Sequence, residues 1–288
     1  MPRRARMVAA LPFLFAAVFF GQQPDAVPKP KGATMTPEQV VQSVKRQAWP
    51  ELSRPGAVPA AAGPALLPLL DDPNPQVREL AVFCLEAAGG PAASKGLMKA
   101  LNDRTETISA AAARALVNHY APEDMAEIRR QLSEHPNEVV REHLALLLGK
   151  TNSKENIPVL MARKAAEKDR EVNHAAHLAL ARLGQPAEKQ EIADLLLNDD
   201  PKTRVDTLRD LPYVNDRGLL AKALPLLDDL RLGLNVGPSH GPYYIRVCDV
   251  VVNIMDEMLN HPFSFKMGLR RYSPEELAEA KAIMASVH

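Results

Sequence analysis

The chain has 288 residues, which is enough for one large core or for an array of repeats. Aromatic residues make up only 5% of it, and basic and acidic residues balance at 35 each. The shortage of aromatic residues favours helices over sheets, and the balanced charge gives the chain no global electrostatic reason to bind nucleic acid.

Residues 1–21 have the composition of a secretory signal peptide or an N-terminal anchor. Three arginines open the segment, and an apolar run over residues 7–20 follows them. This run is too short for a comfortable membrane span but suits the apolar part of a signal peptide. Its last residues, FFG, make a poor cleavage site, so an uncleaved anchor is an alternative, and a buried core helix is a third that we favour less. We therefore expect a secreted or periplasmic protein, membrane-anchored by residues 7–20 if the segment is not removed.

The next segment leads into the first helix. Residues 22–35 form a Pro-rich linker that we expect to be disordered. Thr36 and Gln39 have the spacing of a capping box around a proline, which predicts a helix from there to about Ala48. Trp49 and the Pro- and Ala-rich stretch after it are expected to pack over the open end of the domain that follows.

The stretch 64–90 predicts two short helices folded back on each other. The first covers residues 66–70, a polar elbow (DDP) follows, and the second covers about residues 75–88. Asn74 is a natural N-cap, and the proline after it suits the first helical position. Apolar residues of the second helix recur at i, i+3, i+4 and i+7, which gives one buried stripe. A pair of helices this short cannot bury its stripe alone, so it needs a neighbouring copy.

Copies of this unit follow at a regular spacing. The apolar residue near the start of the second helix recurs as Val77, Ile108, Val140 and Val172, at spacings of 31, 32 and 32 residues. The sequence LPLLDD of the first unit returns 157 residues later, five times a period near 31, and marks a sixth unit. The fifth unit is degenerate, because Pro212 stands where its last apolar residue should be. The predicted units cover about 64–90, 95–119, 123–149, 155–184, 188–213 and 219–259.

Two further features complete the predicted repeat domain, residues 36–288. An inserted loop, residues 230–242, interrupts the sixth unit and either covers the end of the core or forms part of a binding surface. A last helix opens with a capping box at Ser273 and runs to about Val287. We interpret residues 272–288 as the C-terminal cap that an array of repeats needs.

These units resemble HEAT repeats, and more closely the short bacterial kind grouped with phycobiliprotein lyases. The resemblance rests on a proline in the first helix, aspartate at the elbow and Val-Arg-x-x-Ala-x-x-x-Leu in the second helix, over about residues 64–259. It implies an all-α, armadillo-like fold: a right-handed α-α superhelix (HEAT-like solenoid) of about six helical hairpins with N- and C-terminal capping helices. It also implies binding of other macromolecules but no single reaction. Ser109 and Asn173 replace the arginine in units two and four, so we expect no continuous Asp–Arg ladder along the elbows.

The sequence offers little for catalysis, or for a metal or cofactor. His174 and His177 lie one helical turn apart without a third ligand on that helix, and we interpret them as polar residues on its exposed side. Pairs of aspartates recur at the elbows, which indicates helix capping rather than acid–base chemistry. Cys84 and Cys248 lie about five repeats apart, too far for a disulfide, and are expected to be small buried apolar residues. We therefore expect no catalytic, cofactor-binding or metal-ligating residues.

We expect a protein or peptide to bind along a concave surface formed by the second helices. Basic residues are frequent among the outward positions, which favours an acidic segment as the ligand. The predicted partner-binding residues are Arg78, Arg114, Arg141, His174, His177, Arg182, Tyr243 and Tyr244. The favoured function is a non-catalytic interaction scaffold, exported from the cytoplasm, that binds no nucleic acid and meets a membrane only through its N-terminal segment. The alternative is an accessory subunit or lyase-like enzyme that acts on a protein-bound prosthetic group.

Overall fold

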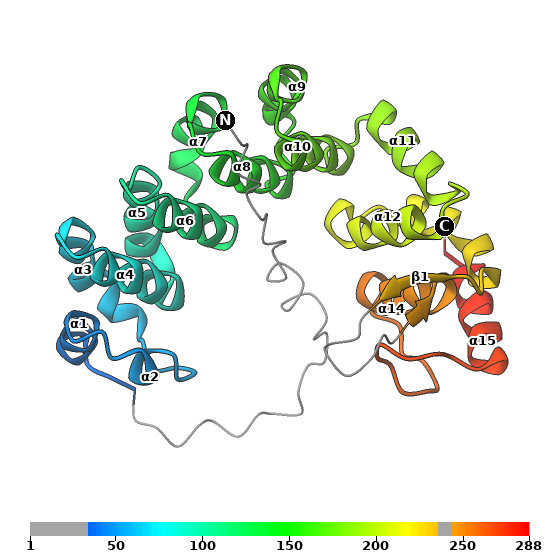
Figure 1. Ribbon diagram of the computed structural model, residues 1–288, viewed down its shortest axis with the longest axis horizontal. Helices are drawn as coiled ribbons and strands as arrows, with labels where there is room; N and C mark the ends of the chain where they lie inside the picture. The colour runs from blue at the N-terminus through cyan, green and yellow to red at the C-terminus, as the bar shows by residue number, and fades with distance from the viewer. Residues whose placement is uncertain (1–33, 236–243, 288) are drawn as a thin grey trace, which may run out of the picture. The chain divides into compact units, whose positions relative to one another are not determined.

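A computed structural model describes residues 34–235 and 244–287 (Figure 1). Its helices pack in consecutive pairs along the chain, so the predicted all-α arrangement of HEAT-like hairpins is confirmed. The predicted signal or anchor segment and most of the predicted linker lie outside the described residues. Across the two described ranges, none of the helices has both the length and the apolar character needed to cross a bilayer.

Six helical pairs place their first and second helices in two layers (Figure 1). The first helices are α3 (Gly63–Leu66), α5 (Gly90–Ala100), α7 (Met125–Glu134), α9 (Ile157–Ala166), α11 (Pro186–Leu196) and α13 (Arg217–Lys222). The second helices are α4 (Pro75–Ala88), α6 (Glu106–His119), α8 (Glu138–Lys150), α10 (Arg170–Arg182), α12 (Pro201–Val214) and α14 (Val247–Leu259). Each second helix contacts the next one, from α4 to α14, and all but α14 also pack against their own first helix. A 3₁₀-helix, Leu224–Asp228, takes that place for α14.

Local sequence sets where the second helices begin. The side chains of Asn74, Asn137, Asp169 and Asp200 each accept a hydrogen bond from a backbone N–H in the first turn of the helix that follows. The first of these helices, α4, begins and ends where the sequence predicted. Helix α12 is longer than predicted, since it continues through Pro212 to Val214.

The first segment that contains the sequence LPLL is less regular than predicted. Residues 66–70 do not form one helix, because α3 ends at Leu66 and a 3₁₀-helix, Leu67–Asp71, follows. Pro68 has no N–H to donate and its ring crowds the preceding turn, which disfavours a continuous α-helix. Shorter 3₁₀-helices lie at Ala60–Ala62, Pro122–Asp124 and Lys154–Asn156.

The N-terminal cap consists of two helices. Helix α1 (Pro37–Lys45) has the predicted capping box at Thr36. It ends before the predicted Ala48, because Gln47 adopts a left-handed conformation with φ of 56° and turns the chain into α2 (Trp49–Leu52).

The inserted loop contains a short β-hairpin that the sequence did not predict. Strand β1 (Leu232–Asn235) pairs antiparallel with β2 (Tyr244–Arg246), and residues 236–243 between them lie outside the described residues. Strand β1 lies against α12, where a Cβ at Gly233 would come within 2.6 Å of Val205 Cγ2 and 2.8 Å of Pro201 O. A glycine at this position therefore allows the hairpin to approach the helix.

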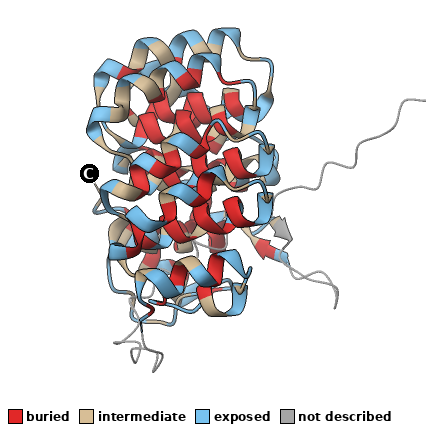
Figure 2. Cartoon of the chain, turned by 90° about the vertical axis from the view of Figure 1, so that its left-hand side faces the viewer, coloured by how far each residue is buried: buried red, intermediate tan, exposed pale blue. Residues whose placement is uncertain are grey.

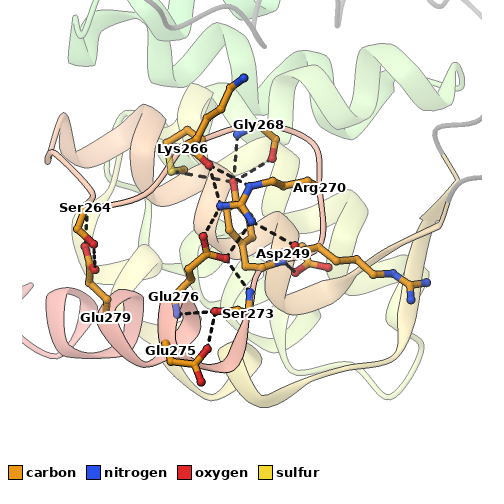
Figure 3. A network of polar contacts seen from close by, with 12 residues as sticks. Asp249, Ser264, Lys266, Gly268, Arg270, Ser273, Glu275, Glu276 and Glu279 are labelled. Atoms are coloured by element: carbon orange, nitrogen blue, oxygen red, sulfur yellow. Dashed lines mark hydrogen bonds and ion pairs between the residues drawn. The ribbon is translucent and has the colours of Figure 1, made fainter.

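A polar network fastens the C-terminal cap to α14 (Figure 3). Helix α15 (Pro274–Met284) has the predicted capping box at Ser273. Arg270 donates two hydrogen bonds to Glu276, at 2.5 and 2.9 Å. Asp249 is fully buried and accepts hydrogen bonds from the Arg246 guanidinium and from the backbone N–H of Tyr272. The charge of the buried Asp249 is therefore compensated by Arg246 and by a backbone donor.

Buried apolar residues form two clusters rather than one. The first cluster extends from Met35 to Leu183 and the second from Leu178 to Met284, so α10 contributes to both. Figure 2 shows the buried residues on the sides of the helices that face their neighbours, and exposed residues at the outer edges of the stack. Cys84 and Cys248 are free and buried, as predicted, and burial raises the pKa of their thiols to about 12 and about 11.

Candidate binding sites on the second helices and beside α10

Two of the arginines predicted to face a partner lie instead at the elbows between repeats. Arg78 is only 3% exposed, and its Nε lies 2.7 Å from Asp103 at the next elbow. Arg141 likewise forms an ion pair with Glu167 at 2.9 Å. Each guanidinium also donates to a backbone carbonyl of its own elbow, that of Asp72 or His135. The prediction that Arg78 and Arg141 point outward is therefore wrong, because the fourth position of a second helix faces the neighbouring elbow.

These arginines belong to a ladder that is interrupted, as the sequence predicted. A third rung joins Arg204 of α12 to Asp229, at 2.6 Å. At the two missing rungs, Asn173 donates to the carbonyl of Lys164 and Ser109 to that of Glu106, so neither reaches the next elbow. The ladder therefore gives the arginine of the repeat pattern a structural role in three repeats, those of Arg78, Arg141 and Arg204.

One groove lies between α2, α4 and α6, and we call it the Trp49 groove. It has a volume of about 340 Å³, and Trp49 and Phe83 form its aromatic wall. The two rings lie 4.6 Å apart at an angle of 48°, and Trp49 remains 49% exposed. Trp49 therefore packs against the first repeat, as predicted, but leaves about half of its side chain exposed.

Charged side chains line the Trp49 groove, and they form no ion pairs within the described part of the chain. Glu79 and Glu86 of α4 line it on one side, and Arg114 of α6 lines it on the other. Among the described residues, none makes a hydrogen bond or ion pair with these three side chains. Arg114 is exposed, as predicted, and it is the predicted partner-binding arginine that lines this groove.

A second site, which we call the α10–α12 cleft, lies where the two apolar clusters meet. It has a volume of about 370 Å³ and receives polar side chains from four helices. They are Lys164 of α9, His174 and His177 of α10, Glu191 of α11 and Asp210 of α12. The structure therefore brings both predicted histidines together in one site.

The two histidines have different surroundings. His174 is exposed and its Nε2 lies 3.2 Å from Asp210, and this hydrogen bond raises the pKa of the imidazole. His177 is only 6% exposed, so the prediction that it lies on the exposed side of the helix is wrong. Burial lowers the pKa of His177, and the nearby Lys164 acts in the same direction. The cleft therefore contains one imidazole, that of His174, whose protonated form is stabilised, and another, that of His177, whose neutral form is stabilised.

Two groups of opposite charge approach the same nitrogen of His177. The Lys164 ammonium lies 3.2 Å from Nδ1, and a carboxylate oxygen of Glu191 lies 3.4 Å from it. Nε2 is buried and has no hydrogen-bond partner among the described residues. His177 is therefore positioned by side chains from both α9 and α11.

The cleft does not have the arrangement of a metal site. His174 and His177 pair with acids on different helices, Asp210 and Glu191. Over the described ranges, no group of three or more His, Cys, Asp or Glu side chains is placed to hold a metal ion.

The remaining predicted residues lie apart from both sites. The Arg182 guanidinium donates to the backbone carbonyl of Tyr213 and lies 5.5 Å from the centre of that ring. Tyr244 lies on β2 and is 39% exposed, and Tyr243 lies outside the described residues. Neither Arg182 nor Tyr244 lines the Trp49 groove or the α10–α12 cleft.

Sequence reasoning missed most of the Trp49 groove. Glu86 and Phe83 carry no motif, and only their spacing along α4 places them on one face. The sequence signal that could have found the groove is the single tryptophan of the chain, Trp49, which stands between the first predicted helix and the first repeat.

Comparisons with known proteins agree with the fold. A family model described as HEAT repeats matches residues 63–129 and 125–211. Among solved structures, the chain is similar to one from the complex of CpcE and CpcF of phycocyanin lyase from Nostoc sp. PCC7120, with 18% sequence identity and a TM-score of 0.52. The similarity covers 91% of this chain and 98% of that one. A search of curated proteins finds no match. Because the family model covers more than half of the sequence, the chain belongs to the HEAT-repeat family.

Proposed function

We propose that the chain is a protein-binding accessory subunit, which acts together with a partner protein on a chemical group that the partner carries. The observation on which the proposal rests is the α10–α12 cleft, where polar side chains of four helices converge between two apolar clusters. The fold supports it, since the similar chain comes from a complex of two proteins, CpcE and CpcF of phycocyanin lyase.

The cleft has the chemistry to hold a polar group attached to an apolar body. Leu178 and Ile192 supply apolar surface beside the charged side chains. Protonated His174, held by Asp210, can donate a hydrogen bond, and Lys164 adds a positive charge that its acidic neighbours contact only at 3.5 Å or more. A group presented by a bound partner could therefore be oriented here without a metal.

A non-catalytic scaffold is the second candidate, and the Trp49 groove favours it. An exposed aromatic pair flanked by charges is typical of protein-docking surfaces and needs no chemistry of its own. Export from the cytoplasm and the absence of enzymatic activity stay predictions from the sequence alone. The residues expected to direct export lie outside the described part of the chain.

Affinity capture tests the proposal. The tagged full chain is cross-linked in the cells that produce it, and the proteins retained are identified by mass spectrometry. The cleft variant combines Lys164→Ala with His174→Ala, and the matched control combines Lys99→Ala with His119→Ala. Lys99 is half exposed and forms an ion pair with Asp71, far along the chain from the cleft.

We expect the wild-type chain and the control to retain the same partner, and the cleft variant to retain at least about tenfold less of it. If the partner carries a coloured prosthetic group, it should absorb light at longer wavelengths than the aromatic side chains of a protein do. A colourless partner would favour the scaffold. Retention of no protein, or equal retention by the cleft variant, would contradict the accessory role.

A further inference from the structure

The exposed face of α4 presents an aromatic ring between two free carboxylates. Glu79, Phe83 and Glu86 stand at i, i+4 and i+7, so their side chains project from the same side of the helix. Seven residues of α-helix place the two acids about 10 Å apart along the axis. The stripe is not part of the buried face of α4, since Glu79 is exposed and Phe83 and Glu86 are partly exposed.

Trp49 extends this stripe into a docking surface. Its ring lies 4.6 Å from that of Phe83, and its exposed half leaves apolar area in contact with water. The backbone under it is well fixed, because Leu52 is buried and Glu51 of the same short helix accepts a hydrogen bond from Ser43 at 2.6 Å. A large, rigidly held and half-exposed tryptophan is typical of the centre of a protein interface.

The charges around the groove indicate what binds there. Two carboxylates, Glu79 and Glu86, face one guanidinium, that of Arg114, and no described residue pairs with any of them. This excess of negative charge attracts a basic segment and opposes an acidic one. The sequence had favoured an acidic ligand because basic residues are frequent among the expected outward positions, but two of these, Arg78 and Arg141, are already paired at the elbows.

We propose that the Trp49 groove docks a segment of a partner protein that carries a bulky apolar side chain between two basic residues. The apolar side chain packs against Trp49 and Phe83, and the basic residues pair with Glu79 and Glu86. This inference goes beyond the proposed function, because it assigns a separate surface, and it requires only that the chain binds a protein.

Trp49 provides the measurement, because it is the only tryptophan of the 288-residue chain. The probe is an alanine-based helical peptide with a central leucine, one lysine a turn before it and another a turn after it. A matched peptide has glutamate in place of both lysines. We expect the lysine peptide to cause a saturable blue shift of the Trp49 emission, which weakens with added salt, and the glutamate peptide to cause none.

Variants test the role of each part of the groove. Glu79→Gln combined with Glu86→Gln should weaken binding of the lysine peptide about tenfold, because it removes both partner charges. The matched control, Glu127→Gln combined with Glu134→Gln on α7, should leave binding unchanged. Trp49→Ala should abolish binding, measured by the anisotropy of a labelled peptide, with far-UV circular dichroism showing that the helices are retained.

Three outcomes would overturn the proposal. They are equal binding of the two peptides, no saturable binding of either, and full binding by the Glu79→Gln and Glu86→Gln variant. A blue shift that grows with protein concentration in the absence of peptide would assign the groove to a second copy of the chain and would also overturn it. None of these results depends on the α10–α12 cleft, so failure here and failure of the capture experiment are distinguishable.

Discussion

The arginine at the fourth position of a second helix joins two repeats with a single side chain. Arg78 donates to the carbonyl of Asp72 at its own elbow and pairs with Asp103 at the next. Where this arginine is missing, the position equivalent to Asp103 at the following elbow is not an acid: it is His135 in the repeat after Ser109 and Asn198 in the repeat after Asn173. A buried carboxylate without a partner would be costly, and in these two repeats both the arginine and the acid of the pair are absent.

Acid titration should report on one such pair. The Arg141 guanidinium and two backbone N–H groups hold the pKa of Glu167 well below its usual range, at about 2, although burial alone would raise it. Because the folded pKa is lower than the unfolded one, the pair stabilises the fold above about pH 4.5, and this contribution is lost as the pH falls toward 2. We expect Glu167→Gln to reduce the free energy of unfolding by about 3 kcal/mol at pH 7.

Urea unfolding at a series of pH values checks this expectation. The gap between wild type and Glu167→Gln should close as the pH approaches 2, because wild-type Glu167 is then protonated as well. Glu134→Gln is the control, since Glu134 forms an exposed pair with Arg130 and should cost less than about 1 kcal/mol. A gap that stays constant across this range would contradict the assignment.

At the scale of elements, α8 and α12 are joined across α10 by one tyrosine. The hydroxyl of Tyr213 donates to the carbonyl of Leu146 at 2.7 Å. A Cβ at Gly149 would lie 2.2 Å from that hydroxyl and 2.7 Å from Cα of Ala179. Gly149 therefore provides the space in which three second helices meet, beside the point where the apolar clusters divide.

We expect Gly149→Ala to destabilise the fold by about 1–3 kcal/mol, although alanine is the better helix former. The cost arises because either Tyr213 or the α8–α10 contact must move. Gly218→Ala on α13 is the control: its new Cβ would have Asp216 Oδ1 as nearest neighbour, at 3.1 Å, and we expect no loss of stability. Chemical denaturation of both variants measures the difference, and equal effects would contradict this explanation.

The second helices could be predicted from sequence because their signals are local. Asn74 and the proline after it fix the start of α4, and the apolar stripe fixes its buried side. The 3₁₀-helix at Leu67–Asp71 was missed, since its geometry depends on how one proline fits between neighbouring helices. The β-hairpin was missed for a similar reason, because its strands are short and Gly233 matters only once α12 lies beside it.

The sites were harder to predict than the fold. His177 is buried because α9 and α11 cover it, and no property of α10 alone reveals this. Arg78 looked like a surface residue because its partner, Asp103, stands 25 residues away, beyond the reach of helical periodicity. Arg114 and His174, by contrast, are exposed as predicted, although the residues that surround them on other helices were not predicted.

At the scale of the whole molecule, the division of the apolar core should be visible in unfolding. Trp49 lies beside the first cluster, which contains Leu52, whereas helices of both clusters contribute to far-UV circular dichroism. Repeat proteins lose all-or-none behaviour where the coupling between neighbours is weak. We expect the Trp49 emission and the dichroism to give different urea midpoints, and coincident transitions would contradict a weak junction at α10.

The elbow arginines recur at 63-residue intervals, from Arg78 to Arg141 and from Arg141 to Arg204, which is two repeats and not one. Removal of a single hairpin would bring Arg78 opposite His135, whereas removal of two would bring it opposite Glu167 and keep the charges matched. Deletion of two hairpins should therefore cost less stability than deletion of one, because only the single deletion leaves the buried guanidinium of Arg78 without a carboxylate.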